Sequence, residues 1–309
     1  MKAILYTHKD CFAHDTGAMH PERAQRLAAI LHALKDIELP GAEWREAPLA
    51  SVEQIGRVHP EDYIEAIHQA IPKEGHAYLD GDTPVSPGSW NAALRAAGAA
   101  CAAVTAVASG EAKRAFCAVR PPGHHAEPEH SMGFCLFNNV AIAAEEARNV
   151  HGMERVAVVD FDVHHGNGTQ AAFWNDGGLF FASTHQHPLY PGTGLPEERG
   201  RADNILNATL PPGAGSAAFR KTFAEQVLPA LEDYAPQLIL ISAGFDAHRA
   251  DPLANLNFEA ADYHWATREL CMLANRCADG RVVSTLEGGY DLEALAESAT
   301  QHVLALLEP

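Results

Sequence analysis

The chain has 309 residues, 47% of them hydrophobic, which is enough for a substantial core and predicts a single domain over residues 1–309. Its 40 acidic residues outnumber the 22 lysines and arginines, and the resulting formal net charge of −18 argues against binding to nucleic acid. The six cysteines form no CxxC pair and lie mostly in apolar runs, which indicates reduced core residues rather than disulfides.

Short apolar runs alternate with longer helical patterns, which is typical of βαβ units around a mainly parallel sheet. The strands are predicted at residues 2–6, 115–119, 155–159, 179–183, 238–242 and 281–286. A helix is predicted from Pro21 to Leu34, because proline is tolerated in the first turn and the leucines fall on one face. Ser51-Val-Glu-Gln54 resembles a capping box, and Asp291 is expected to cap the last helix. We therefore expect an α/β fold with helices on both faces of the sheet.

Two apolar segments bear on the location of the protein. The N-terminal run over residues 1–6 is followed by His8, Lys9 and Asp10 and is too short for the core of a signal peptide. The alanine-rich stretch 96–108 is too short and too weakly apolar to cross a bilayer, so we expect a tightly packed helix there. The sequence therefore predicts a cytoplasmic protein without membrane partners.

Polar residues follow five of the predicted strands. They are His124-His125 after Pro-Pro-Gly, Asp160-Phe-Asp162-Val-His164, Thr184-His185, Asp246 after Ala-Gly-Phe, and Tyr290 after Glu-Gly-Gly. In open α/β sheets, ligands bind outside the carboxyl ends of the strands, so these five segments are expected to converge on one pocket.

Asp162, His164 and Asp246 offer two carboxylates and one imidazole to a metal ion. Side chains at i and i+2 of a strand share a face, so Asp160, Asp162 and His164 are expected to project together. Three such ligands leave a fourth position for water, which indicates a catalytic rather than a structural site. The imidazole argues against calcium or magnesium, so zinc is the first expectation and iron and cobalt stay open.

The remaining polar residues suggest how an amide could be hydrolysed at such a site. One of His124 and His125 is expected to take a proton from the metal-activated water and return it to the leaving amine. Asp160 and Asn167 are the expected partners of the two imidazoles, each fixing one tautomer. Tyr290 follows two glycines that permit a sharp turn, and its hydroxyl is expected to donate to the developing oxyanion.

Taken together, these motifs resemble the zinc-dependent histone deacetylase family, in particular its class II-like group of bacterial histone deacetylases and acetylpolyamine amidohydrolases. The resemblance extends from His20-Pro-Glu-Arg23 to Tyr290. It implies the arginase/deacetylase fold, with one catalytic Zn²⁺ bound by Asp162, His164 and Asp246. It also implies that His125 is the general base and acid, that His124 is its electrostatic partner, and that Tyr290 polarises the carbonyl.

The resemblance implies further binding positions. Those for the substrate are Gly133 and the aromatic walls Phe134 and Tyr190, the rim carboxylate Asp82, and Leu253, which stands where polyamine-selecting relatives carry a glutamate. Those for a structural potassium ion are Asp160, Asp162, His164, Ser183 and Thr184. Arg23 matches an interior arginine associated with acetate release, and Asn167 is typical of the class II branch.

The leading hypothesis is therefore a zinc-dependent amidohydrolase that removes an acetyl or short acyl group from an amine such as acetyl-lysine. An acetylpolyamine or another small amide is the alternative substrate of the same mechanism. A binuclear manganese ureohydrolase is a weaker alternative, because such enzymes need an Asp-x-Asp pair where this chain has Asp246-Ala-His248. A non-catalytic binder of acylated ligands is the last alternative. The sequence leaves the oligomeric state open, a homo-oligomer included.

Overall fold

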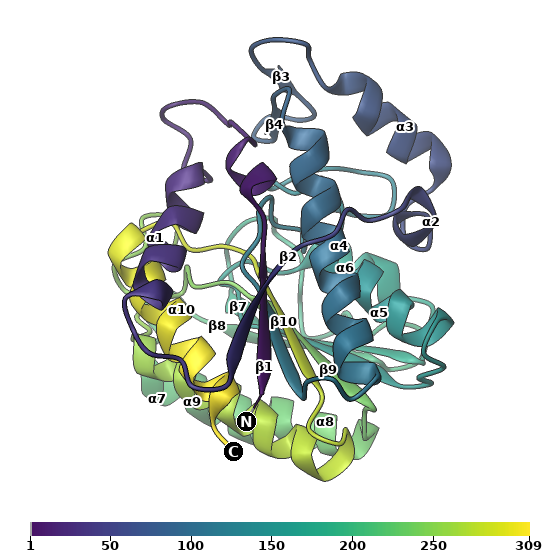
Figure 1. Ribbon diagram of the computed structural model, residues 1–309. Helices are drawn as coiled ribbons and strands as arrows, with labels where there is room; N and C mark the ends of the chain where they lie inside the picture. The colour runs from purple at the N-terminus through teal and green to yellow at the C-terminus, as the bar shows by residue number, and fades with distance from the viewer. Residues whose placement is uncertain (1) are drawn as a thin grey trace.

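The computed structural model describes residues 2–309, which form one eight-stranded sheet with helices on both faces (Figure 1). The strand order is β2-β1-β5-β10-β9-β6-β7-β8, and all neighbouring strands are parallel. Their bounds are β1 Ala3–Thr7, β2 Ala42–Glu46, β5 Arg114–Cys117, β6 Val156–Asp160, β7 Leu179–Gln186, β8 Ile205–Leu210, β9 Leu238–Ala243 and β10 Val282–Leu286. A small antiparallel pair, β3 Ala77–Tyr78 and β4 Pro84–Val85, lies outside this sheet. The predicted α/β architecture is confirmed.

The helices form two layers. One layer packs around α10 Leu292–Leu307, which contacts both α1 Ala24–Lys35 and α9 Ala260–Cys277. The other is built from α4 Ser89–Ala108 and α5 Asn139–Asn149, which pack against each other. The remaining helical segments are η1 Lys9–Phe12, α2 Val52–Ile55, α3 Glu61–Ala70, α6 Asn167–Phe173, α7 Ser216–Thr222, η2 Phe223–Val227 and α8 Leu228–Tyr234.

The six predicted strands are all present, and each overlaps its predicted range. The short pair β3 and β4 was not predicted, and the two strands of the main sheet that were not predicted, β2 and β8, are its edges. Edge strands are buried less completely than central ones, so their sequences lack the continuous apolar run that marks a buried parallel strand. β2 illustrates this, because none of its residues is buried, whereas every residue of β6 and β9 is buried.

Two of the predicted helix starts are confirmed and one is displaced. Ser51 and Gln54 form a capping box, and the Asp291 carboxylate accepts from the backbone N–H of Ala294. The helix predicted from Pro21 instead begins at Ala24, because Arg23 is extended and serves as the N-cap. The preceding residue, Glu22, is fully buried, so the chain enters the interior before it turns into the helix.

α4 corrects one expectation about membranes. The helix has 20 residues and a mean hydropathy of 1.3 in its most apolar window, so it is long and apolar enough to span a bilayer by composition alone. Residues 96–108 alone are too short to cross a bilayer, but the helix begins earlier, at Ser89, and this added length reaches the span that a bilayer requires. In this structure 72% of that window is buried inside the fold, as expected for a tightly packed core helix.

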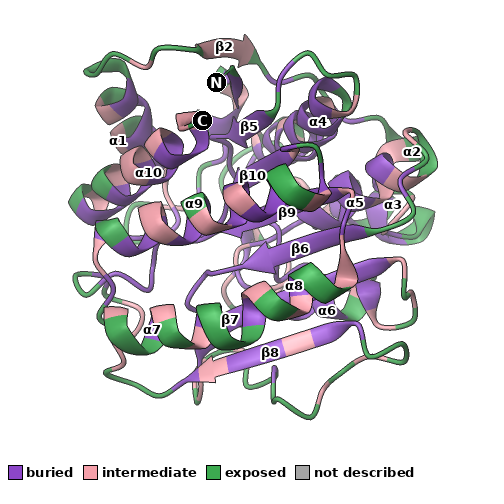
Figure 2. Ribbon diagram, turned by 90° about the horizontal axis from the view of Figure 1, so that it is seen from below, coloured by how far each residue is buried: buried purple, intermediate pink, exposed green. Residues whose placement is uncertain are grey.

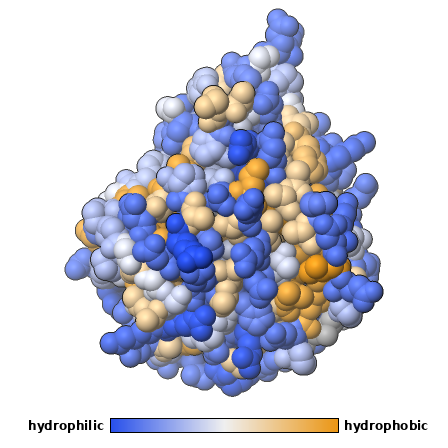
Figure 3. Space-filling model, turned by 90° about the vertical axis from the view of Figure 1, so that its left-hand side faces the viewer, coloured by the Kyte–Doolittle hydropathy of each residue, from blue (hydrophilic) through white to orange (hydrophobic). Residues whose placement is uncertain are grey.

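Burial is concentrated on the sheet. Figure 2 shows that the central strands are buried along their length and that the helices expose only their outer faces. Figure 3 shows that the side of the molecule carrying α1 is largely hydrophilic, with separate small apolar areas. The parallel strands therefore place their carboxyl ends together at one edge of a rigid, buried sheet, where the polar segments follow.

Candidate active site

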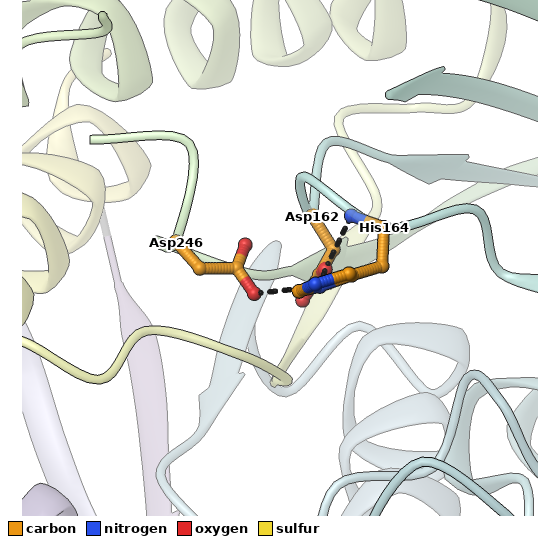
Figure 4. Close-up of side chains that lie close together, drawn as sticks. All are labelled: Asp162, His164 and Asp246. Carbon is orange, nitrogen blue, oxygen red and sulfur yellow. Dashed lines mark hydrogen bonds and ion pairs between the residues drawn. The ribbon is translucent and has the colours of Figure 1, made fainter. Parts of the chain in front are cut away.

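Three of the predicted residues converge beyond the carboxyl ends of β6 and β9. Asp162 and His164 follow β6, and Asp246 follows β9. Figure 4 shows the two carboxylates turned toward the imidazole, whose Nδ1 lies 3.1 Å from Asp162 Oδ1 and 3.1 Å from Asp246 Oδ2. One ligand atom of each residue lies within 4.8 Å of the others, and all three residues are buried. The structure thus brings together a set of side chains that could hold a metal ion.

The surroundings of these carboxylates fit a bound cation. Asp162 Oδ2 accepts the backbone N–H of Gly288 at 2.8 Å, and Asp246 Oδ1 accepts that of Val163 at 2.8 Å. A Cβ at Gly244 would lie 2.0 Å from Asp162 Oδ2, and one at Gly288 would lie 2.1 Å from Asp246 Oδ2. Only glycine leaves room for the two carboxylates at these positions. The requirement for Gly288 is therefore mainly steric, beyond the turn expected from the sequence.

Charge balance leads to the same conclusion. Burial alone would lower the pKa of His164, yet its hydrogen bonds to Asp162 and Asp246 raise the pKa to about 10. The two buried carboxylates therefore attract a positive charge into the site. A divalent cation bound by the neutral imidazole would take the place of that proton.

The local backbone of this segment differs from the prediction. β6 ends at Asp160, so Asp162 and His164 lie in a loop and not on one face of a continuous strand. Asp160 Oδ1 accepts the N–H of Asp162 at 3.0 Å, and Asp162 Oδ1 accepts that of His164 at 2.9 Å. These two successive aspartate turns bend the chain, because a short carboxylate readily bonds the backbone two residues further on.

The histidine pair lies beside the ligand set, after β5. The Nδ1 atom of His124 lies 2.9 Å from Asp160 Oδ2, and the Nδ1 atom of His125 lies 2.8 Å from Asn167 Oδ1. Asp160 and Asn167 were expected to hold one imidazole each, and the structure pairs Asp160 with His124 and Asn167 with His125. The backbone N–H groups of Gly123 and His124 donate to Glu287 Oε2 at 2.6 and 3.1 Å, which fixes the loop that carries the two imidazoles.

The two imidazoles have opposite electrostatic surroundings although both are buried. Burial lowers the pKa of His125 well below its ordinary value, and the neighbouring His124 and His164 lower it further. Burial opposes ionisation of His124 as well, but the carboxylates of Asp162 and Asp160 outweigh it and raise the pKa of His124 well above its ordinary value. These opposite pKa shifts favour the neutral form of His125 and the cationic form of His124.

A cavity of about 210 Å³ opens onto these groups. Its lining includes all five residues expected to bind substrate, together with three residues of the reacting centre: Asp82, Gly133, Phe134, Tyr190 and Leu253, and His125, His164 and Tyr290. The ring of Tyr190 meets His125 edge-on at 5.2 Å, and the ring of Phe134 meets Tyr290 edge-on at 5.9 Å. Two aromatic rings therefore flank the approach to the histidine and the tyrosine.

Backbone contacts hold the wall of this cavity in place. Gly133 has φ +57°, and a Cβ there would lie 2.4 Å from the His125 ring. Phe134 also has a positive φ of 70°. Asp82 Oδ1 accepts the N–H of Gly133 at 3.1 Å, so this carboxylate supports the wall as well as facing the cavity.

The interior arginine is Arg26, which corrects the prediction for Arg23. Arg23 is only half-buried at the start of α1, whereas Arg26 is fully buried one turn later. The guanidinium of Arg26 lies 4.8 Å from the centre of the Tyr290 ring and donates to the carbonyls of Gly289 at 2.6 Å and Glu287 at 2.5 Å. The sequence signal was the four-residue spacing of Arg26 from buried Glu22, with which it pairs at 3.1 Å.

Three of the residues expected around potassium, Asp160, Ser183 and Thr184, lie on adjacent strands, and Asp162 and His164 lie in the loop that follows β6. Asp160 of β6 pairs with Ser183 of β7, and Thr184 Oγ1 donates to the Asp160 carbonyl at 3.5 Å. The Ser183 hydroxyl lies 2.8 Å from His185 Nδ1. Ser183 and Thr184 are therefore adjacent to the Asp160 segment, and the potassium ion itself stays a prediction.

Comparisons with known proteins agree with this arrangement. The family model of the histone deacetylase domain matches residues 20–306. Histone deacetylase 14, chloroplastic, of Arabidopsis thaliana is 40% identical over 98% of this chain and 76% of its own length. The histone deacetylase-like amidohydrolase of Pseudomonas aeruginosa is 43% identical over 88% of this chain and 72% of its own length.

A solved structure supports the same assignment. The crystal structure of the HDA15 HD domain superposes with a TM-score of 0.93 at 33% identity, covering 99% of this chain and 89% of that one. The fold, the motifs and the sequence relatives agree across nearly the whole length. The chain therefore belongs to the histone deacetylase family and is an amidohydrolase.

Proposed function

We propose that this protein is a zinc-dependent deacetylase that hydrolyses the amide of an acetylated primary amine with an acetyl-lysine-like stem. The observation that carries the proposal is the convergence of a possible metal triad, a neutral imidazole and a phenol on one cavity of about 210 Å³. Zinc suits the donor set, because two carboxylates and one imidazole leave an open position for water or substrate. When bound, zinc would supply Lewis-acid polarisation of the acyl carbonyl and lower the pKa of water.

The residues of the chain supply proton transfer, charge and hydrogen-bond donation. Since His125 is neutral and its Nδ1 faces Asn167, its Nε2 is the nitrogen left to accept a proton from water and deliver it to the leaving amine. His124 supplies a fixed positive charge next to it. Burial raises the pKa of Tyr290 well above its ordinary value, so the phenol stays protonated and donates to the developing oxyanion. The guanidinium of Arg26 packs against the face of the Tyr290 ring and helps to fix the position of the phenol.

The shape of the cavity supports a narrow, uncharged stem next to the acyl group. Phe134 and Tyr190 flank the approach, and Leu253 presents an apolar side chain to the same cavity. An apolar residue offers no partner to the internal ammonium of a polyamine, so the acetyl-lysine type of substrate is favoured over the polyamine type. We extend the proposal to a structural potassium ion near Ser183 and to a cytoplasmic location.

One experiment tests the proposal directly. Purified protein loaded with zinc is expected to release acetate from a fluorogenic acetyl-lysine peptide, to lose this activity on chelation and to regain it with added zinc. Tyr290→Phe is expected to lower kcat about 100-fold, since one oxyanion donor is worth roughly 3 kcal/mol. Tyr234→Phe, at the end of α8, is the control and should leave kcat unchanged.

Two outcomes would contradict the proposal. One is the absence of acetate release from acetyl-lysine peptides and from acetylated polyamines at full zinc occupancy. The other is a preparation that holds two manganese ions per chain and hydrolyses a guanidinium substrate, as expected of a ureohydrolase. The structure argues against the second outcome, because His248 rather than a carboxylate follows Asp246 by two residues and its Nδ1 accepts the backbone N–H of Ala250.

A further inference from the structure

The partner of His125 is itself held by a carboxylate outside the reacting centre. Asn167 bonds His125 Nδ1 through its Oδ1 at 2.8 Å, and its Nδ2 donates to Glu127 Oε1 at 2.8 Å on the other side. The other two neighbours of this Nδ2 are more distant, namely the His125 carbonyl at 3.4 Å and the Met132 sulfur at 3.3 Å. Glu127 is therefore the strongest partner of the amide nitrogen.

The donor and acceptor chemistry of this chain of contacts determines the tautomer of His125. A carboxylate only accepts hydrogen bonds, so Glu127 requires the NH₂ group of Asn167 on its side. This requirement directs the amide oxygen toward His125, and an amide oxygen also only accepts. The hydrogen of the neutral imidazole must then lie on Nδ1, and the lone pair must lie on Nε2.

We propose that Glu127 is a positioning residue that fixes the amide of Asn167 and, through it, the ring orientation and tautomer of His125. This inference rests on the proposed role of His125 as the general base. Without the carboxylate, the amide of Asn167 could rotate and present its NH₂ group to Nδ1, which would place the imidazole hydrogen on Nε2. A ring in that tautomer cannot accept a proton from water.

Hydrogen bonds fix the turn that carries Glu127. Glu127 pairs with His130 across a tight turn, with N–H to carbonyl distances of 2.9 and 3.4 Å. His59 holds the same turn through Nδ1 to the Pro128 carbonyl at 3.0 Å, and its Nε2 accepts the N–H of Asn138 at 2.9 Å.

The start of α6 is fixed against the loop that carries the two histidines. The N–H of Gly168 donates to the His124 carbonyl at 3.0 Å, and a Cβ at Gly168 would lie 2.2 Å from the Ala126 carbonyl oxygen. The spacing between Glu127, Asn167 and His125 is therefore set by backbone packing, so a changed side chain would not be corrected by movement of the loop.

Glu127 can be varied without crowding. Glu127 and Asn167 share a hollow of about 340 Å³ with Trp174 and Thr193, and this hollow has no lining residue in common with the substrate cavity. Glutamine has nearly the shape of glutamate and keeps an acceptor oxygen. Comparing Glu127→Gln with Glu127→Ala therefore separates the loss of charge from the loss of the hydrogen bond.

The first measurement uses the zinc-loaded protein and the fluorogenic acetyl-lysine peptide. Glu127→Ala is expected to lower kcat about 10-fold with KM within about 2-fold, as for a residue that orients a catalytic group, and Glu127→Gln to keep about a third or more of the activity. Glu129→Ala, two residues further along the same turn and exposed, is the matched control and should leave kcat unchanged. A value of kcat within 2-fold of the parent protein for Glu127→Ala overturns the inference.

The second measurement reverses the sign of the effect. In an Asn167→Asp background, Glu127 would face a carboxylate oxygen where it now meets an N–H donor. Glu127→Gln then supplies a donor of its own and is expected to raise kcat by a factor of about 3 or more. A purely structural role for Glu127 predicts the same direction in both backgrounds, and this result overturns the inference. The test remains decisive if Glu127→Ala fails to fold.

The third measurement does not depend on turnover. The ¹⁵N resonances of the His125 ring distinguish a protonated from an unprotonated nitrogen. The parent protein is expected to show the hydrogen on Nδ1, and Glu127→Ala a mixture of the two tautomers. Should the parent protein hydrolyse no amide, the proposed function fails, while these resonances still decide the role of Glu127. An unchanged tautomer in Glu127→Ala overturns the inference.

Discussion

His124 and His125 are neighbours in sequence with ring centres 4.0 Å apart, and both are buried, yet their pKa values shift in opposite directions. The carboxylates of Asp162 and, next, Asp160 raise the pKa of His124, whereas burial and the neighbouring His124 and His164 lower the pKa of His125. His124 meets the carboxylate of Asp160, whereas His125 meets the neutral amide of Asn167. The pKa values of two identical side chains thus move apart because their surroundings differ in charge.

The two sides of this pair are also built from different parts of the fold. The His124 side consists of strand ends, with Asp160 closing β6 and Glu287 directly after β10. The His125 side consists of the start of α6 and the turn that carries Glu127. The charged partners of His124 therefore lie at the buried edge of the sheet. The groups that orient the neutral His125 lie on the more accessible side, at α6 and the Glu127 turn.

Removing each imidazole in turn is the strongest test of this contrast. His125→Ala is expected to lower kcat about 1,000-fold or more, because a positioned general base contributes roughly 10²–10⁴-fold. His124→Ala is expected to lose clearly less, because it removes only an electrostatic partner. The measurement is kcat at pH 8 with zinc content determined for each variant. Equal losses would mean that the two imidazoles do not have separate roles.

Asp160→Asn gives His124 the same kind of partner that His125 has. The His124 ring and the N–H of Asp162 bond different oxygens of this carboxylate, so the asparagine amide keeps one of the two acceptors and removes the charge with little change of shape. We expect kcat to fall about 10- to 100-fold, since the positive charge of His124 is no longer held. Asp233→Asn, on the exposed surface of α8, is the control. Parent-like kcat for Asp160→Asn would show that this charge is not used.

Asn167→Asp makes the opposite exchange and is expected to act mainly through pH. His125 works in its neutral form, so the rate falls as pH drops through its pKa, which lies below the ordinary value of 6.5. A carboxylate on Nδ1 stabilises the imidazolium and raises this pKa. The acid limb of kcat/KM should therefore move up by about 1 pH unit. An acid limb that stays in place would argue that it belongs to another group.

Much of the site could be predicted from the sequence because parallel strands are marked by continuous apolar runs. Six strands were found this way, and the residues directly after them, such as Asp246 and Tyr290, then had to meet at one edge of the sheet. That Asp160 and Asn167 would each hold one imidazole was also predictable, because all of these residues follow strands of one parallel sheet.

The parts that were missed depend on three-dimensional packing. Arg26 and Arg23 are close in sequence, and only the displaced start of α1 decides which one enters the interior. Edge strands β2 and β8 carry mixed sequences because one side of each has no neighbouring strand. Glu127 resembles any loop glutamate until the distance of 2.8 Å to Asn167 is known.

The smallest predicted effect is on stability. It concerns the carboxylate of Glu287, which accepts the backbone N–H groups of Gly123 and His124. Burial raises the pKa of Glu287 from 4.5 to about 7, although His124 and two backbone N–H groups act against it. Below pH 4.5 the folded and unfolded states are both protonated at this group, so its contribution is fully present. Between pH 4.5 and 7 the unfolded state ionises first, and stability is lost as pH rises.

Glu287→Gln cannot ionise and keeps an oxygen that accepts from Gly123 and His124. Its Tm relative to the parent protein should therefore rise from pH 5 to pH 8, by about 2–4 °C for roughly 1 kcal/mol in a chain of this size. Glu297→Gln, exposed on α10, should show no such trend. Parallel Tm curves for Glu287→Gln and the parent protein would mean that Glu287 is already ionised in the fold. His124 would then owe its positive charge to three buried carboxylates instead of two.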